Sequence, residues 1–259
     1  IPSHVQPYIQ SYSNLSDLHK SILHLIALTY FDLSFEALHE CVGSLHHFFP
    51  SKDHFPSNKL TSALQSLHSK KILSYYNCLA HPLDHFLTLE ALKGPLATQY
   101  LEAIDTVSKK QESSFYRSYS EDELSLNQLR LALYMNKEKK FHQLAKEYSF
   151  EELTDFFSEI FLGQFLELEW IKERPLLAQQ LIVHAKLHGM CTTTEVIENI
   201  QDIISYYGSL RDKPEFASLN MSFLPYDILS GDLTRLEKSL TKFDQESSEY
   251  RSIEGTLTF

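Results

Sequence analysis

Apolar residues recur at spacings of three and four along most of this chain, which is the period of amphipathic helices. Three such runs follow one another between residues 15 and 70, each beginning at a serine that can accept a hydrogen bond from the first turn of a helix. The expected capping residues are Ser16, Ser34 and Ser57. The pattern therefore predicts three short helices in this part of the chain.

Two short runs after the third helix have the character of β-strands. Residues 72–76 read Ile-Leu-Ser-Tyr-Tyr and residues 85–89 read His-Phe-Leu-Thr-Leu, with a proline-containing turn between them. This pattern predicts an antiparallel hairpin. Three helices followed by a hairpin over residues 15–92, with Leu-His-Ser-Lys-Lys-Ile-Leu at residues 67–73 where the third helix enters the hairpin, resemble the winged-helix family.

The second half of the chain alternates short helical runs with brief breaks. A helix is expected over residues 95–110, and the polar stretch 111–122 has the composition of a linker. Glycines at positions 163, 189 and 208 are expected to end helices in the left-handed conformation. One pattern of six positions occurs twice with identical spacing, at residues 129, 133, 136, 141, 145 and 148 and again at residues 224, 228, 231, 236, 240 and 243. This repeat resembles the tetratricopeptide helix pair, with Asn136 or Gly231 at the turn.

The expected fold class is thus mainly α, in two domains. Residues 1–110 would form the winged helix with its small β-hairpin and a flanking helix, and residues 111–259 an array of tetratricopeptide-like helix pairs. Paired helices of this length normally stack into a bundle or solenoid, because none of them can bury its apolar face alone.

Glycine usage and cysteine usage exclude several classes of protein. Only seven glycines occur, and no two are close enough to form a phosphate-binding loop, a dinucleotide fingerprint or a nucleophile elbow. We therefore expect no catalytic residues and no cofactor. No apolar run approaches the ~20 residues that span a bilayer, so no membrane association is expected. Three scattered cysteines are typical of a reducing compartment, which indicates a cytoplasmic protein.

Charge is distributed unevenly along the chain. Residues 1–110 hold eight lysines, no arginine and nine acidic residues, whereas residues 111–259 hold 15 basic and 25 acidic residues. If the winged helix bound DNA, its third helix would use Lys59, Lys70 and Lys71. A DNA-binding domain usually presents a strongly basic face, which this domain lacks. The acidic second half favours basic protein partners, bound through apolar side chains displayed between helices.

Histidines are concentrated in the first half of the chain, which raises the question of a metal site. The tightest arrangement is Cys78-x-x-His81-x-x-x-His85, whose ligand types and spacings occur in zinc sites. A fourth ligand is not evident unless Cys41 or His68 folds nearby. The expected metal content is none, with Cys78, His81 and His85 as the candidates if one is found.

A winged helix followed by helical pairs is similar to the regulatory region of signal-transduction NTPases of the STAND type, in which the winged helix follows the ATPase core. Accessory regions of bacterial Swi/Snf-type helicases are also similar. The resemblance implies a non-catalytic regulatory or protein-interaction module without an ATP site, belonging to a larger multidomain protein. The first residue is Ile1 rather than methionine, which agrees with that expectation. A DNA-binding regulator and an enzyme with an unrecognised site stay open as alternatives.

Overall fold

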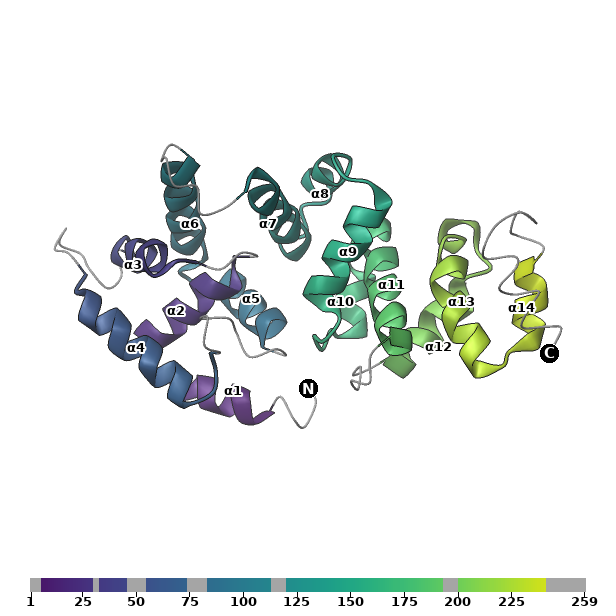
Figure 1. The fold of residues 1–259 in the computed structure, drawn as a ribbon, viewed down its shortest axis with the longest axis horizontal. Coiled ribbons are helices and arrows are strands. Elements are labelled where there is room, and N and C mark those ends of the chain that lie inside the picture. Colours follow the sequence, from purple (N-terminus) through teal and green to yellow (C-terminus); the bar gives the residue numbers. More distant parts are fainter. Residues whose placement is uncertain are drawn as a thin grey trace. The chain divides into compact units, whose positions relative to one another are not determined.

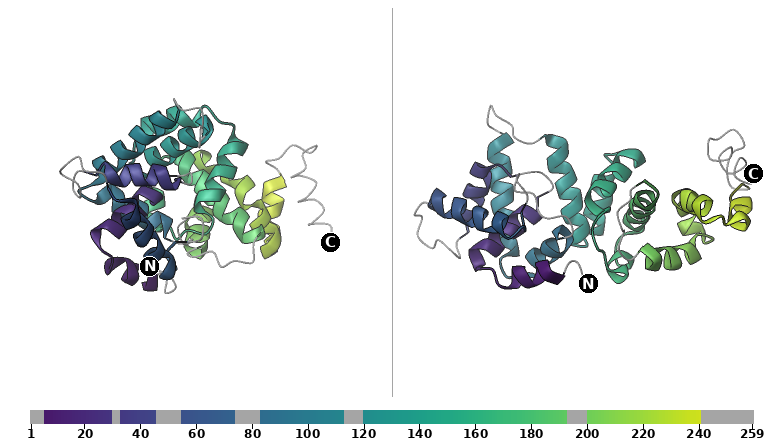
Figure 2. Two further views of the ribbon diagram at one scale, coloured as in Figure 1. Left: turned by 60° about the vertical axis from the view of Figure 1, so that its left-hand side comes forward. Right: turned by 60° about the horizontal axis from the view of Figure 1, so that its bottom comes forward.

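The computed structural model describes residues 6–29, 33–45, 55–73, 83–112, 120–192 and 200–240. Within these ranges the chain forms fourteen α-helices and one short 3-10 helix, and no β-strand (Figure 1). Two further views show the same helical segments (Figure 2). The chain divides into two compact units, residues 1–148 and residues 149–259, here termed unit 1 and unit 2.

Unit 1 is built around its second helix. Its helices are α1 (Gln6–Ser13), α2 (Asp17–Ala27), α3 (Phe35–Gly43), α4 (Ser57–Ser69), α5 (Asp84–Lys93), α6 (Ala97–Glu112), α7 (Glu121–Tyr134) and α8 (Glu138–Ala145). Helix α2 packs against α3, α4, α5 and α6, and its side chains Ile22, Leu23 and Leu25 are fully buried. The domain boundary expected between residues 110 and 111 lies in the last turn of α6, inside unit 1.

Two of the three expected helix caps are confirmed. The Ser16 side chain accepts a hydrogen bond from the backbone of His19, and the Ser34 side chain accepts one from the backbone of Ala37 at 3.1 Å. The third was wrong, because Ser57 is itself the first residue of α4 and Pro56 occupies the cap position without a side-chain hydrogen bond. Pro56 has the extended backbone usual at a cap position, but a proline side chain has no oxygen that could accept a hydrogen bond from the first turn.

The predicted hairpin, and with it the winged helix, was wrong. Residues 85–89 lie within α5 instead of a strand, and its buried positions are His85, Leu87, Thr88 and Ala91, with the cap residue Leu83 buried before them. These positions have helical spacing, which coexists in the sequence with the alternation of residues 85, 87 and 89. Packing of α5 against α2 decides between the two patterns. Of the other predicted strand, residues 74–76 lie outside the described residues, as does the turn up to residue 82.

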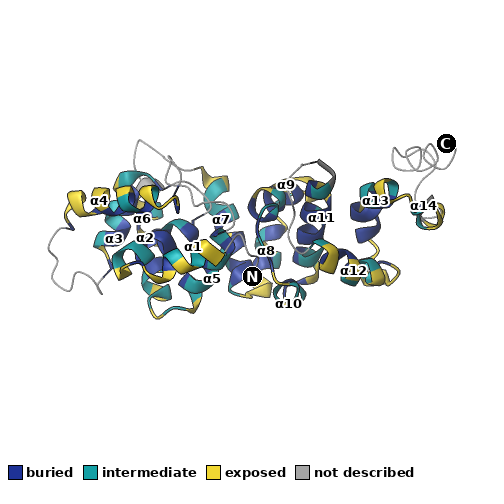
Figure 3. Cartoon of the chain, turned by 90° about the horizontal axis from the view of Figure 1, so that it is seen from below, coloured by how far each residue is buried: buried dark blue, intermediate teal, exposed yellow. Residues whose placement is uncertain are grey.

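Unit 2 is a helical array, as expected for the second half of the chain. Its helices are α9 (Phe150–Phe161), α10 (Leu168–Lys172), α11 (Leu176–Thr192), α12 (Ile200–Leu210), α13 (Leu219–Ser230) and α14 (Leu233–Leu240), with a 3-10 helix at Pro214–Phe216. Helix α11 packs against α9 and α13. Its buried residues include three consecutive ones, Leu181, Ile182 and Val183, and Figure 3 colours the helices by burial. A helix that is apolar on several sides belongs in the middle of its unit.

The two helix pairs matched in the sequence share the construction of their turns. Asn136 joins α7 to α8 with φ 53°, and Gly231 joins α13 to α14 with φ 69°. After Asn136, the amide of Lys137 donates to the carbonyl of Ala132 at 2.8 Å. After Gly231, the amide of Asp232 donates to the carbonyl of Asp227 at 3.2 Å. Left-handed residues with this hydrogen bond end a helix sharply, so the expectation of paired helices at these positions is confirmed.

The other three glycines do not end helices in the expected way. Gly189 lies inside α11 and Gly208 inside α12, while Gly163 follows α9 without a positive φ. A side-chain methyl at Gly208 would lie 3.7 Å from the Phe223 ring of α13. Helices α11 and α12 thus continue through their glycines, which a helix interior tolerates.

Candidate functional site

A groove lies between α6 and α7 in unit 1, with the beginning of α8 at one end. Its volume is about 330 Å³. Three helices provide its lining residues. These are Leu101, Ile104, Asp105, Ser108 and Lys109 on α6; Leu124, Asn127, Gln128, Leu131 and Ala132 on α7, with Met135 directly after it; and Lys137 and Lys140 at the start of α8. We call this feature the α6–α7 groove.

The groove follows from the side-chain periodicity of its two walls. On α7, positions 124, 128, 131 and 135 are separated by four, three and four residues, so they line one face of the helix. Leu124 and Leu131 are half-buried at the edge of the unit 1 core. The opposite face of α7 carries Leu129 and Leu133, which are buried. Helix α7 is therefore held in unit 1 by one face and leaves the other face along the groove.

The buried and half-buried lining side chains are apolar apart from Asn127 and Ser108, and they form the floor of the groove, whereas the exposed lining side chains at its edges are all polar or charged. Leu101, Leu131 and Met135 are half-buried, whereas Gln128 is exposed. Lys109 pairs with Asp105 at 2.6 Å, and both side chains are mostly exposed. The lining includes three lysines and one aspartate, a local net charge of +2 in a chain whose net charge is −11. Because apolar side chains and lysines line it, the groove is suited to binding an apolar and anionic surface.

The buried face of α7 is anchored by an arginine. The guanidinium of Arg130, 1% exposed, donates to the carbonyl of Ala27 at 2.8 Å, to the carboxylate of Asp84 at 2.6 Å and to the hydroxyl of Thr88 at 2.9 Å. Burial lowers the pKa of Arg130, but Asp84 and the neighbouring Tyr134 raise it by more, so the guanidinium stays charged. Arg130 thereby joins α7 to α5 and to the end of α2.

Sequence reasoning missed this anchor, although one signal was present. Arg130 lies four residues after Leu126 and three before Leu133, at helical spacing within the apolar run 129–133. A charge on the apolar face of an amphipathic helix must find partners inside the core, because an unpaired buried charge is strongly unfavourable. The sequence could indicate the burial of Arg130, but not that its partners would be Asp84 and Thr88.

The metal candidates are only partly described. Cys78 and His81 lie outside the described residues. His85 is buried in α5, where its Nδ1 is hydrogen-bonded to the Tyr134 hydroxyl at 3.0 Å. The nearby ligands considered, Cys41 and His68, are a buried free thiol and a ring whose Nδ1 lies 3.2 Å from the Leu73 carbonyl. In the described ranges, no group of three or more histidine, cysteine or acidic side chains could hold a metal ion.

The candidate DNA-binding lysines are all exposed, at or after α4. Lys59 lies beside a shallow hollow between α2 and α4, lined also by His19 and Ser62. Lys70 is close enough to His19 to lower the pKa of that ring, in addition to the larger effect of burial. Lys71 follows α4 with φ 57°. Lys59 lies near the beginning of α4, whereas Lys70 and Lys71 follow its end, and the second strand expected after them is replaced by α5.

A second polar cluster ties α1 and α6 to α2. The Tyr12 hydroxyl lies 2.7 Å from Nε2 of His24, and the Tyr100 hydroxyl lies 3.4 Å from its Nδ1. Tyr100 also hydrogen-bonds Ser21 at 2.9 Å. Burial, and to a smaller extent the positive charge of Lys20, lowers the pKa of His24 to about 4. The ring is therefore neutral at pH 7 and acts as part of the core.

Unit 2 buries a lysine at the end of α9. The Nζ of Lys186 donates to the carbonyls of Leu162, at 3.1 Å, and of Gln164. The side chain is fully buried, and burial lowers its pKa to about 7. Leu162 is the C-terminal cap residue of α9, where carbonyls have no partner within the helix, and the amine from α11 satisfies this carbonyl together with that of Gln164 in the following loop. Lys186 is enclosed by these contacts, which indicates a role in joining α9 to α11.

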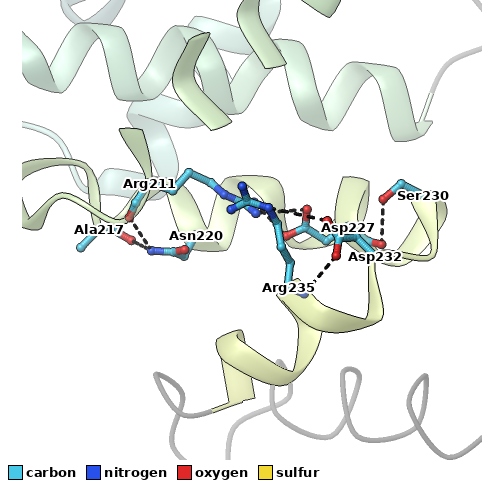
Figure 4. Close-up of polar contacts among 7 residues, drawn as sticks. All are labelled: Arg211, Ala217, Asn220, Asp227, Ser230, Asp232 and Arg235. Atoms are coloured by element: carbon cyan, nitrogen blue, oxygen red, sulfur yellow. Dashed lines mark hydrogen bonds and ion pairs between the residues drawn. The ribbon is translucent and has the colours of Figure 1, made fainter. Parts of the chain in front are cut away.

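Unit 2 also contains a buried ion pair, between Arg211 after α12 and Asp227 on α13 (Figure 4). The guanidinium donates to the two carboxylate oxygens at 2.8 and 3.3 Å, and both side chains are nearly inaccessible. Burial raises the pKa of Asp227, and the charge of Arg211 opposes that rise. Asn220 on α13 adds two hydrogen bonds to this cluster, donated to the carbonyls of Arg211 and Ala217. These contacts connect the end of α12 to α13.

Comparison with known protein families, with curated proteins and with solved structures finds no match to this chain. Neither the tetratricopeptide resemblance nor the resemblance to STAND-type NTPases and Swi/Snf-type helicases is supported by a related protein. In the part of the chain that the structure describes, none of the helices combines the length and the apolar character required to cross a membrane.

Proposed function

We propose that this chain is a non-catalytic protein-interaction module and that the α6–α7 groove is its binding surface. The observation that carries this proposal is the character of the groove, whose apolar floor lies between polar edges. Protein-binding sites commonly have an apolar centre surrounded by polar residues. The ionisable residues buried in both units, by contrast, are engaged in holding helices together, as described for Arg130, Lys186 and Asp227.

The location of this surface differs from the location expected from the sequence. We expected partner binding within residues 111–259 and through a surface attractive to basic proteins. The groove takes one wall from α6 and the other from α7, so it uses residues 101–140 on both sides of the expected domain boundary. Its lysines favour partners of the opposite charge. The proposal retains a cytoplasmic location, because the three scattered cysteines suit a reducing compartment.

Site-specific photocrosslinking tests the proposed function. A photoreactive amino acid replaces Gln128, which is exposed at the groove, and in a matched control it replaces Gln65, which is exposed on α4. We expect a discrete protein adduct from position 128 that does not form from position 65. The adduct partner is then identified by mass spectrometry, purified and titrated directly against the full chain. The Leu131→Glu substitution should abolish that binding, because it places a charge on the apolar floor.

Two results would argue against the proposal. One is an identical set of adducts from positions 128 and 65, since this would show that contact at the groove is non-specific. The other is a purified partner whose affinity does not change with Leu131→Glu while circular dichroism shows that the variant retains its helix content. In that case the partner would bind elsewhere on the chain.

A further inference from the structure

The start of α8 places positive charges where they are electrostatically unfavourable. Lys137 is the cap residue of α8, and Lys139 and Lys140 lie in its first turn together with one acid, Glu138. The amino-terminal end of a helix carries a partial positive charge and favours acidic side chains. Lys137 and Lys140 are exposed, and neither forms an ion pair within the ranges that the structure describes. An anionic group brought to this point would relieve the repulsion.

These lysines are located at the end of the α6–α7 groove. The apolar wall on α7 extends from Leu124 to Met135, and Lys137 follows directly after the turn at Asn136. Eleven residues of α-helix correspond to about 16 Å, or about three turns. The groove therefore offers an apolar strip of this length between two helices, with positive charge at one end.

A helix is the element that best matches this shape. Amphipathic helices bind in grooves by presenting apolar residues at positions i, i+3, i+4 and i+7, which meet the corresponding stripes of the groove. The lining positions of α6 and α7 have helical spacing, and the apolar ones among them are Leu101 and Ile104 on α6 and Leu124, Leu131 and Met135 along α7. A third helix lying between them would bury the half-exposed side chains of Leu101, Leu131 and Met135.

We propose that the α6–α7 groove binds an amphipathic helix of a partner protein whose acidic residues contact Lys137 and Lys140. This inference rests on the proposed function and specifies the chemistry of the partner. The local charge of +2 attracts acidic segments, whereas the net charge of −11 of the whole chain repels acidic proteins in general, so apolar contacts in the groove must add to the local attraction. Both features of the partner, the apolar stripe and the acid at its end, are thus needed for binding.

A fluorescent helical peptide tests this inference on the full chain. The peptide has leucines at helical spacing over three turns and glutamates along its flanks and at one end. Its two controls are the same peptide with lysine in place of glutamate, and a scrambled sequence of the same composition that lacks a continuous apolar stripe. Fluorescence anisotropy should show saturable binding of the acidic amphipathic peptide, and neither control should bind.

Charge-reversal variants of the protein locate the interaction. The double substitution Lys137→Glu and Lys140→Glu should weaken peptide binding by about tenfold or more, because it replaces attraction by repulsion. The matched control, Lys59→Glu and Lys71→Glu, reverses two lysines that do not line the groove and should leave the affinity unchanged. The variants at α8 place acids in the first turn of a helix, which stabilises it, so a loss of binding is not explained by unfolding.

Several outcomes would overturn the inference. Equal binding of the basic peptide, or binding that does not respond to the α8 charge reversal, would contradict the role of Lys137 and Lys140. Displacement of the acidic peptide by decanoate at similar concentrations would assign the groove to a small anionic amphiphile. Self-association in sedimentation experiments that is lost on Leu131→Glu would assign it to a second copy of the chain. If crosslinking at position 128 identifies a basic or non-helical partner, this inference fails while the proposed function stands.

Discussion

The Arg130 anchor makes an asymmetric prediction about stability. Removing the carboxylate with Asp84→Ala leaves a charged guanidinium that is 1% exposed, beside the Ala27 carbonyl, the Thr88 hydroxyl and Tyr134 but without an anionic partner. Removing the guanidinium with Arg130→Met leaves a carboxylate that is 22% exposed and can be hydrated. Breaking a buried ion pair by deleting one partner costs about 3–5 kcal/mol when the remaining charge is buried.

We therefore expect Asp84→Ala to lower the free energy of unfolding of unit 1 by about 3 kcal/mol. Arg130→Met should cost about 1–2 kcal/mol, because it removes hydrogen bonds but leaves no charge without access to water. The decisive variant combines the two substitutions. With both charges gone, no buried ion remains unpaired, so the double variant should be more stable than Asp84→Ala alone.

Urea denaturation followed by far-UV circular dichroism measures these differences. Fluorescence of Trp170, the only tryptophan of the chain, reports separately on unit 2 and shows whether the effect is confined to unit 1. The reasoning would be refuted if Arg130→Met were as destabilising as Asp84→Ala. It would also be refuted if the double variant lost the sum of the two single effects, because the guanidinium would then not be the source of the penalty.

Three further predictions concern the other buried groups. The pKa of His24 is about 4 in the folded protein and about 6.5 when unfolded, so the unfolded state binds more protons between these values and stability falls as pH drops from 6.5 toward 4. His24→Gln should flatten this decline in urea titrations, whereas the control His142→Gln, at a half-buried position outside the core, should not. The pKa of Lys186 is about 7 in the folded protein, below its unfolded value, so stability rises with pH above 7 until the unfolded lysine is also neutral. The difference in unfolding free energy between wild type and Lys186→Met should follow that rise. A difference that stays constant from pH 7 to 10 would contradict this prediction. Gly208→Ala should stabilise unit 2 by about 0.5–1 kcal/mol, because alanine favours the helix interior and its methyl would be in ordinary contact with the Phe223 ring; destabilisation in Trp170 fluorescence melts would show that the contact is too tight.

Local signals in the sequence were sufficient for most helices and for several of their ends. Ser16 and Ser34 cap helices as predicted, because a serine before an apolar run satisfies an amide that the helix itself leaves unpaired. Asn136 and Gly231 form left-handed turns as predicted, because these residue types tolerate a positive φ. Such features depend on a few adjacent residues, and the sequence by itself therefore determined the helical class and the paired helices at these turns.

Tertiary packing decided what local patterns left ambiguous. Residues 85–89 fit a strand by their alternation and a helix by the spacing of Leu83, Leu87 and Ala91, and contact with α2 selected the helix. The partners of Arg130 come from positions 46 and 103 residues earlier in the chain, and no local rule relates residues so far apart. The α6–α7 groove likewise depends on two helices held apart by contacts on their other faces. The sequence could indicate which faces are apolar, but only the fold determines which of those faces is left uncovered.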